Sequence, residues 1–338
     1  MKLLQKLIEA YGVSGNEEHI RELIRKEISP YVDEIFVDKA GNLIARKKGK
    51  SPKVMLAAHM DEIGLMIKRI NSDGKIAFTA IGGVTAISLP GQRVKIHTEK
   101  GSLYGVITTI EMSNGEPVTK LPLLKEMYID TGLDKKTLEQ KGVEIGDYLN
   151  LVQESGILGN DDLIYGKALD DRIGCYILIE LARLLKKSVS EIYFVFTVQE
   201  EIGLYGAKTS AYEVEPDWAI AVDAMDARDA DGEASIILGN GPCITIKDEQ
   251  ILGNKCINKW LSTTARKNNM LMQFNVADYG ATDAASISLS RSGVPTSVVG
   301  IPVRNVHSTV GIAHKKDIKA AIKLLERLLK NPPAHCIP

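Results

Sequence analysis

A short apolar run that ends beside two acids constrains this 338-residue chain more than any other segment. Residues 192–198 read Ile-Tyr-Phe-Val-Phe-Thr-Val, and Glu200 and Glu201 follow after one further residue. A β-branched and aromatic run of this length predicts a strand that is buried on both faces. Active sites of open α/β sheets lie at the carboxyl ends of such strands, so we expect the two acids to lie in one.

Helix-like and strand-like patterns alternate on both sides of this run and predict an α/β domain. The predicted helices cover residues 3–9, 17–28, 168–185, 257–267, 283–289 and 316–329. The other predicted strands of this domain cover residues 34–37, 43–46, 54–58, 218–222 and 296–301.

The pattern changes between about residues 66 and 153, where short strands alternate with turns. The predicted strands cover residues 76–81, 92–97, 102–107 and 147–152, with turn signals such as Pro90-Gly91 between them. We therefore predict a small β-barrel-like domain of residues 66–163. It is inserted into a three-layer α/β/α catalytic domain with a mixed sheet, formed by residues 1–65 and 164–338.

Composition excludes several classes of partner. The chain has 42 basic and 43 acidic residues and a net charge of -1, which gives no case for nucleic acid or an anionic membrane. It has no apolar stretch long enough for a membrane span. The four cysteines lack metal or disulfide spacing, so we expect mostly free thiols in a cytoplasmic protein, with Cys175 in a helix core.

Side chains that could bind a metal lie next to apolar runs, and all fall in the α/β segments. The candidates are His59, Asp170 or its neighbour Asp171, Glu200 and Glu201, Asp223 and His307. Taken singly, each candidate also has a purely structural explanation: a core histidine, acids at a helix start, or loop residues. The structural explanation is weakest for Glu200 and Glu201, because adjacent acids beside a buried strand repel each other unless a cation binds them.

Together these candidates suit a metal site with two ions better than a structural zinc site, which uses four ligands. A two-metal site keeps positions open for water and substrate and leaves one acid as a general base. Asp61 is two residues from His59 and could accept the second ring N–H of that histidine. Nitrogen and oxygen ligands suit either Zn or Co.

Several segments, taken in order, resemble the glutamyl/deblocking aminopeptidase family over nearly the whole chain. They are Gly12-Val-Ser-Gly15, Gly41-Asn-Leu43, His59-Met-Asp61, Ala168-Leu-Asp-Asp-Arg-Ile-Gly174, Val198-Gln-Glu-Glu-Ile-Gly203, Gly280-Ala-Thr-Asp-Ala284 and Ile301-Pro302 with His307-Ser308. Members of this family are metallo-aminopeptidases with two metal ions, and some form tetrahedral dodecamers.

The resemblance implies a role for each candidate. Asp170 would bridge two divalent ions, His59 and Asp223 would complete one site, and Glu201 and His307 would complete the other. Glu200 would be the general base, and Asp61 would orient His59. The Asp170–Asp171 peptide bond is expected to be cis.

The leading hypothesis is therefore an aminopeptidase that removes N-terminal residues from short peptides. Some relatives carry the label endoglucanase, so a glycosidase is the alternative, although neighbouring acids such as Glu200 and Glu201 cannot easily flank a sugar ring. A non-catalytic scaffold is a third reading, and it would have lost the base or a ligand.

The inserted β domain is the predicted site of self-association. The resemblance makes it a dimerisation domain, and the apolar segment Leu121-Pro-Leu-Leu124 suits a subunit contact. We expect a homo-oligomer built from dimers, most simply a dodecamer that encloses its active sites and admits only peptides.

Overall fold

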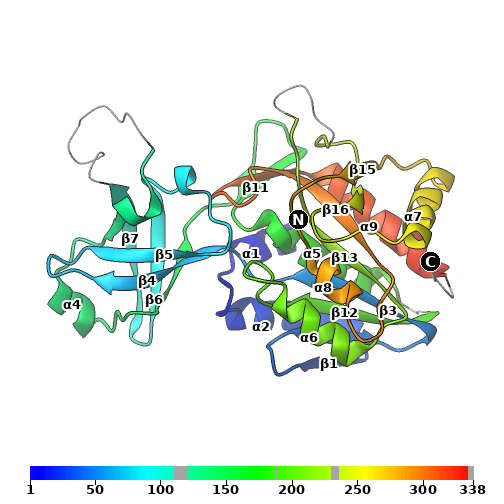
Figure 1. Cartoon of the computed structure of the whole chain (residues 1–338), viewed down its shortest axis with the longest axis horizontal. Helices are drawn as coiled ribbons and strands as arrows, with labels where there is room; N and C mark the ends of the chain where they lie inside the picture. Colours follow the sequence, from blue (N-terminus) through cyan, green and yellow to red (C-terminus); the bar gives the residue numbers. More distant parts are fainter. Residues whose placement is uncertain (110–120, 187–188, 230–235, 334–338) are drawn as a thin grey trace.

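The computed structural model describes residues 1–109, 121–186, 189–229 and 236–333, which form a large α/β body and a separate barrel (Figure 1). Within these ranges the helices of four or more residues are α1 (Lys2–Glu9), α2 (Glu18–Ile28), α4 (Lys135–Gln140), α5 (Leu169–Leu184), α6 (Tyr205–Val214), α7 (Lys255–Lys267), α8 (Asp283–Ser288) and α9 (Lys315–Lys330).

The large body is built on a mixed sheet with the strand order β1-β2-β12-β3-β13-β16-β17-β11-β10, and β14 and β15 lie beside β16. These strands are β1 (Glu34–Val37), β2 (Leu43–Lys47), β3 (Lys50–His59), β10 (Gly156–Ile157), β11 (Leu163–Gly166), β12 (Ser190–Thr197), β13 (Trp218–Asp226), β14 (Cys243–Lys247), β15 (Gln273–Val276), β16 (Thr296–Arg304) and β17 (Gly311–His314).

The four central strands of this sheet, β12, β3, β13 and β16, run parallel. Their carboxyl ends therefore meet along one edge of the sheet. The outer pairs β1–β2, β16–β17 and β11–β17 are antiparallel, which makes the sheet mixed as predicted.

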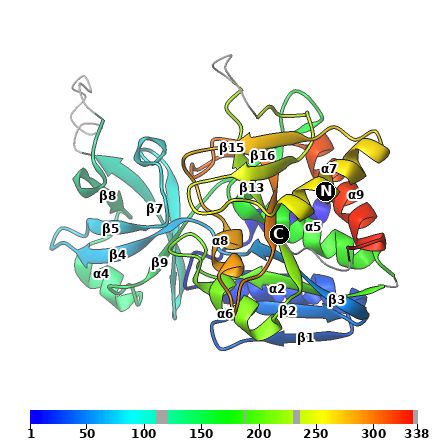
Figure 2. The ribbon, with the colours of Figure 1, turned by 45° about the vertical axis from the view of Figure 1, so that its right-hand side comes forward.

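Helices cover both faces of this sheet and give three layers (Figure 2). Alternate residues of β3 show the two sides: Val54 and Leu56 face a core shared with α5 and α9, whereas Met55 faces a core shared with α6 and α8. Both faces of the central strands are apolar because both are covered. The predicted three-layer α/β/α architecture is confirmed.

A closed antiparallel barrel with the order β4-β5-β8-β7-β6-β9 stands to one side of this body (Figure 1). Its strands are β4 (Gly64–Ile70), β5 (Ile76–Ile81), β6 (Arg93–Thr98), β7 (Gly101–Thr109), β8 (Met127–Asp130) and β9 (Tyr148–Leu151). Its interior has its own apolar cluster, which includes Leu65, Ile96 and Ile129. The predicted inserted barrel is confirmed, and the exact division at residues 65 and 164 stays a prediction.

The cysteines only partly follow the expectation. Cys175 lies buried in α5, as predicted, and Cys243 is also buried with a free thiol. The prediction of free thiols is wrong for Cys256, which is disulfide-bonded. In the described parts of the chain, no helix has both the length and the apolar character needed to cross a bilayer.

Candidate metal centre

The shared edge of the parallel strands gathers the candidate ligands. His59 is the last residue of β3, Asp223 lies on β13, and Glu200 and Glu201 follow β12. His307 follows β16, and Asp170 lies in the first turn of α5. Parallel strands end at the same edge of a sheet, which explains why residues so far apart in the chain meet.

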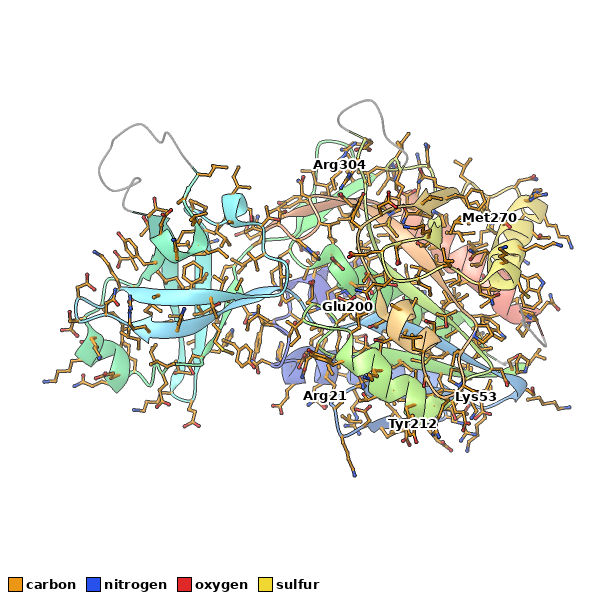
Figure 3. All side chains as sticks on the ribbon, in the orientation of Figure 1. Arg21, Lys53, Glu200, Tyr212, Met270 and Arg304 are labelled. Carbon is orange, nitrogen blue, oxygen red and sulfur yellow. The ribbon has the colours of Figure 1, made fainter. Side chains whose placement is uncertain are left out.

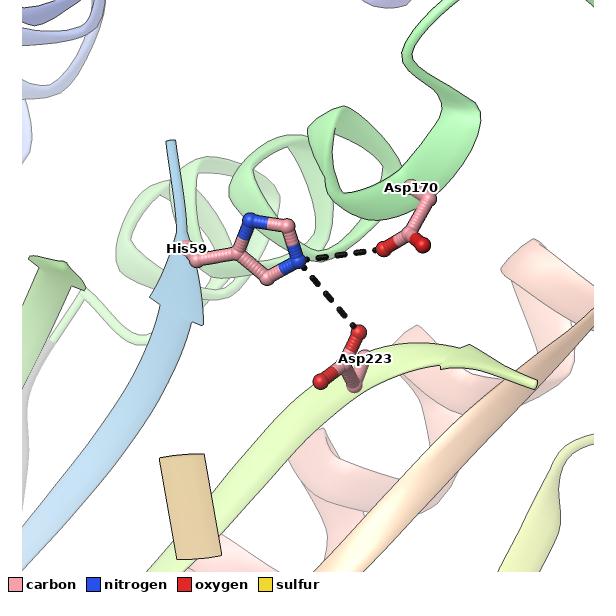
Figure 4. A group of neighbouring side chains, drawn as sticks. All are labelled: His59, Asp170 and Asp223. Carbon is pink, nitrogen blue, oxygen red and sulfur yellow. Dashed lines mark hydrogen bonds and ion pairs between the residues drawn. The ribbon is translucent and has the colours of Figure 1, made fainter. Parts of the chain in front are cut away.

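One group of ligand atoms comes from His59, Asp170 and Asp223 (Figure 4). Nε2 of His59 lies 3.0 Å from Oδ1 of Asp170 and 3.7 Å from Oδ1 of Asp223. The three ligand atoms all lie within 4.8 Å of one another. A group this compact offers one nitrogen and two carboxylate oxygens to a single cation.

A second group comes from Asp170, Glu201 and His307, so that Asp170 belongs to both. Nε2 of His307 lies 3.5 Å from Oδ2 of Asp170 and 3.3 Å from Oε2 of Glu201. The two oxygens of Asp170 therefore face different groups. A carboxylate can place its two oxygens on different cations.

The backbone around Asp170 has an unusual geometry. The Asp170–Asp171 peptide bond is cis, as the resemblance implied, and Ala168 has a left-handed φ of 48°. The neighbouring Asp171 points elsewhere: Oδ1 accepts a hydrogen bond from the N–H of Gly174, and Oδ2 is buried without a partner. The next residue, Arg172, donates to the carbonyls of Leu7 and Ala10, and its Nη2 lies 3.5 Å from Oε1 of Glu62.

Asp61 is fully buried and joins two parts of the site. Nδ1 of His59 lies 3.1 Å from the backbone carbonyl oxygen of Asp61 and 3.6 Å from its Oδ1. The carboxylate also accepts hydrogen bonds from the backbone N–H groups of Glu200 and Glu201, at 3.1 and 3.2 Å. The hydroxyl of Ser14 donates a third, at 2.6 Å. The Asp61 carboxylate thus holds the turn that carries both glutamates, a contact that sequence spacing could not reveal.

Glu200 belongs to neither ligand group but lies beside the first. Its Oε2 is 3.9 Å from Nε2 of His59, and its side chain is 10% exposed. Figure 3 shows this residue near the middle of the molecule, between the barrel and Met270 at the far end. Burial raises the pKa of Glu200 well above its usual value, and the charge of Asp223 adds to this effect. An acid in such a position suits proton transfer near neutral pH.

The buried carboxylates of the cluster outnumber its two histidines, so its negative charge is not balanced by its own side chains. Burial raises the pKa of Glu201 well above normal, and it raises the pKa of Asp223 to about 6. Although burial disfavours charge on His59, the carboxylates of Glu200, Asp170 and Asp223 raise its pKa well above normal. Among the described ion pairs, the site carboxylates meet only the two histidines. This excess of buried oxygen ligands fits divalent cations.

A cavity of about 720 Å³ opens over the two groups. Ile236, Asn275 and Tyr279 contribute to its wall beyond the metal-ligand candidates. Its arginines are paired with acids: Arg228 Nε lies 3.0 Å from Asp226, and Arg304 forms two hydrogen bonds with Asp229.

Sequence reasoning assigned no role to several buried polar residues of the site. Asp283, in the Gly280–Ala284 motif, is 2% exposed and accepts a hydrogen bond from the hydroxyl of Thr197. Burial raises the pKa of Asp283 to about 7. Ser14 and Asn42 lie in the two glycine-containing segments near the amino end and also contact the site region. In the sequence, the one signal that could have identified these residues is that each is a polar residue in a short glycine-containing motif.

Comparison with known proteins gives the same picture over nearly the whole chain. The lysyl aminopeptidase of Pyrococcus furiosus is 35% identical over 338 residues, which cover 97% of this chain and 96% of that protein. The structure of the TET aminopeptidase from the marine sediment archaeon Thaumarchaeota archaeon SCGC AB-539-E09 is 33% identical, with a TM-score of 0.94 over 98% of this chain and 96% of that one.

A second solved structure bears on assembly. It is that of Pyrococcus horikoshii TET1 peptidase, which can assemble into a tetrahedron or a large octahedral shell. It is 32% identical, with a TM-score of 0.88 over 98% of this chain and 99% of that one. The family model of the M42 glutamyl aminopeptidases matches residues 41–324. The chain therefore belongs to the M42 glutamyl aminopeptidase family and is a metallo-aminopeptidase.

Proposed function

We propose that this protein uses two divalent metal ions to remove N-terminal residues from short peptides. The observation that carries the proposal is the position of Asp170, whose two oxygens each belong to a separate three-residue ligand group. His59 and Asp223 would complete one site, and Glu201 and His307 would complete the other. The nitrogen and oxygen ligands suit Zn or Co.

Bound cations would supply Lewis acidity, which lowers the pKa of a water molecule and polarises a peptide carbonyl. The remaining chemistry falls to the protein. Glu200 would accept a proton as the water attacks the first peptide carbonyl and would then deliver it to the leaving amine. Its burial and its place 3.9 Å from His59 support this role. Asp61 would fix both His59 and the backbone of Glu200.

The cavity supports a peptide substrate with a free amino end. A volume of about 720 Å³ accommodates one side chain and the start of a peptide, but no folded protein. The α-amine of the substrate would lie near the carboxylates of the cluster. The paired state of Arg228 and Arg304 leaves the charge of an acidic substrate side chain without an obvious partner among the described cavity residues.

The barrel, which we assign to residues 66–163, would serve as the dimerisation domain. Its surface exposes apolar side chains that suit contact with a second copy. They are Ile87, Tyr104, Val106, Leu121 and Leu123. With the assemblies of Pyrococcus horikoshii TET1 peptidase as the model, we propose a homo-oligomer of dimers that forms a dodecamer. A cytoplasmic location belongs to the same proposal; the free thiols of Cys175 and Cys243 support it, whereas the disulfide of Cys256 does not.

The alternative of an endoglucanase is less well supported by the site. A glycosidase needs two carboxylates on opposite sides of a sugar bond and has no use for two histidines within ligand distance of a shared aspartate. A non-catalytic scaffold is disfavoured because every proposed ligand and the proposed base are present in the cluster.

A panel of aminoacyl chromogenic substrates tests the proposal directly. The protein would be stripped with chelator and assayed with no metal, with Zn and with Co, alongside a cellulose-derived oligosaccharide. We expect aminopeptidase activity only after metal is added. Metal-independent cleavage of the oligosaccharide, or no peptide cleavage with either metal, would contradict the proposal.

A further inference from the structure

The turn that carries Glu200 and Glu201 has a strained backbone. Gln199 has a φ of 55° and Leu204 a φ of 57°, which are left-handed backbone values that residues other than glycine rarely adopt. Residues in such conformations persist only where the surrounding structure holds them in place. The contacts around residues 198–206 therefore bear on where the glutamates lie.

The side chain of Asn42 holds both ends of this turn. Its Oδ1 accepts a hydrogen bond of 3.0 Å from the N–H of Val198, and its Nδ2 donates one of 3.0 Å to the carbonyl of Gly206. Asn42 is fully buried, so water cannot replace these contacts. An added Cβ on Gly206 would lie 2.3 Å from Oδ1 of Asn42, so the close approach requires glycine there.

Asp38 holds the Asn42 side chain in turn. One oxygen of Asp38 accepts the backbone N–H groups of Ala40, Gly41 and Asn42, each at 2.9 Å. Its other oxygen accepts a 2.7 Å hydrogen bond from Nδ2 of Asn42. Both oxygens are acceptors at once, which a carboxylate can provide and an amide cannot.

A second contact holds the same turn from the metal side. There the Asp61 carboxylate accepts the N–H groups of Glu200 and Glu201, with the hydroxyl of Ser14 behind it. The strained turn is thus fixed at its ends by Asn42 and in its middle by Asp61. None of the Asn42 contacts involves a metal-ligand candidate.

We propose that Asn42, aligned by Asp38, is a positioning residue for catalysis that keeps Glu200 and Glu201 in their working places. This inference rests on the proposed role of Glu200 as base. Neither Asn42 nor Asp38 lines the cavity, so a change at either should act through the turn and not on substrate binding. Misplacement of a catalytic group by about 1 Å can cost roughly a hundredfold in rate.

The main test is Asn42→Asp in the full-length, metal-loaded protein. The new carboxylate keeps an acceptor for Val198 but repels Asp38 and the carbonyl of Gly206, so the turn should shift. We expect kcat to fall by about tenfold to a hundredfold. KM should change by less than about threefold when metal is supplied in excess, which keeps both proposed sites filled although the shift of Glu201 weakens the second one.

Exchange of the side chains at positions 38 and 42 tests whether kcat can be restored. In the double variant Asp38→Asn with Asn42→Asp, donor and acceptor trade places and the 38–42 contact can form again. The carboxylate at position 42 still faces the carbonyl of Gly206, so recovery should be partial. A clear gain in kcat over Asn42→Asp would show that the 38–42 contact matters and not only the identity of residue 42. If Asn42→Asp does not fold, the single variant Asp38→Asn tests the inference. Asp38 is partly exposed, so this variant should fold, and the new amide can satisfy only one of the two sets of partners that the carboxylate satisfies. The expected result is again a lower kcat.

A matched control is Asn258→Asp, the same substitution at another buried asparagine. Asn258 lies on α7 and contacts the carbonyl of Thr245 and the hydroxyl of Ser297. It should lower the melting temperature without lowering kcat. An unchanged kcat in Asn42→Asp, or an equal loss in Asn258→Asp, would overturn the inference.

Glu200→Gln, assayed in parallel, separates this inference from the proposed function. An active Glu200→Gln would refute the base assignment itself. An inactive Glu200→Gln together with a fully active Asn42→Asp would refute only the positioning role.

Discussion

Nζ of Lys167 lies 2.5 Å from Oε2 of Glu62, and both side chains are buried. Glu62 precedes the first barrel strand, and Lys167 follows β11 as the chain returns to α5. The other oxygen of Glu62 accepts hydrogen bonds from the N–H of Gly12 and from Asn150 on barrel strand β9. This ion pair therefore lies at the joint between the barrel and the α/β body.

Replacement of Lys167 by Met should destabilise the protein, because the buried Glu62 carboxylate loses its nearer cation and is left with Nη2 of Arg172, 3.5 Å from its Oε1. Loss of one partner from a buried pair costs about 3–5 kcal/mol, and the remaining Arg172 should keep the cost at or below the lower end of this range. The measurement is the free energy of unfolding from urea denaturation. The double variant Glu62→Gln with Lys167→Met should be less destabilised, and equal stability of the two variants would argue against a paired charge.

Glu200→Gln should keep both metals and the fold but lose nearly all turnover. The substitution keeps the shape of the side chain and removes its ability to accept a proton. General-base catalysis is worth about a hundredfold or more, so kcat should fall by at least that factor. Residual activity within about tenfold of the parent, with full metal content, would exclude Glu200 as the base.

His307→Ala should empty one metal site before the other. His307 contacts Asp170 and Glu201 but not Asp223, so only the second ligand group loses a member. Metal analysis at limiting free Zn should give close to one ion per subunit, against two in the parent. Asp170→Asn provides the contrast, since Asp170 belongs to both groups and its change should weaken both sites.

The metal-free protein should become less stable as the pH rises from about 5 to 8. Burial raises the pKa of Asp223 to about 6 and of Asp283 to about 7, whereas these acids titrate near 4 in an unfolded chain. The folded state then holds protons that the unfolded state has lost, so stability falls with pH.

Melting temperatures of the chelated protein across this pH range test the prediction. In the metal-loaded protein a cation would replace the proton of Asp223 and its charge would lower the pKa of Asp283 nearby, so the loss between pH 5 and 8 should shrink. A chelated protein that grows more stable toward pH 8 would contradict the assignment of raised pKa values.

Deletion of the barrel should reduce the size of the native particle. The exposed apolar side chains of Tyr104 and Val106 on β7 identify a finer test, in which both are changed to Glu. Light scattering should show a large particle for the parent and smaller ones for both variants. A monomeric parent at micromolar concentration would refute the oligomer, and unchanged large variants would refute the role of the barrel.

The sequence predicted the centre of the fold well and its margins poorly. The run at 192–198 and the helix at 168–185 correspond to β12 and α5, because both are long and mostly buried among apolar partners. The four-residue strands β11, β15 and β17 were not predicted, nor was α6. A four-residue strand carries little pattern, so such strands were recognised only in part: β1 and β9 were predicted and these three were not. The helix α6 has few strongly apolar residues.

The site shows the same limit in another form. Parallel strands bring His59 and Asp223 together, so a residue at a strand end can be assigned to the site from sequence alone. The link from Asp61 to the N–H groups of Glu200 and Glu201 depends on how two loops approach in space. The side chain of Arg172 turns toward α1, a direction that spacing along a helix does not determine either.

The cluster draws its members from both ends of the chain, from His59 at the end of β3 to His307 after β16. A growing polypeptide on the ribosome therefore lacks the second ligand group until almost all of it has been made. Contacts between such distant residues also form late in folding. A nascent chain of this protein therefore lacks a complete metal centre and cannot hydrolyse peptides until its synthesis is nearly finished.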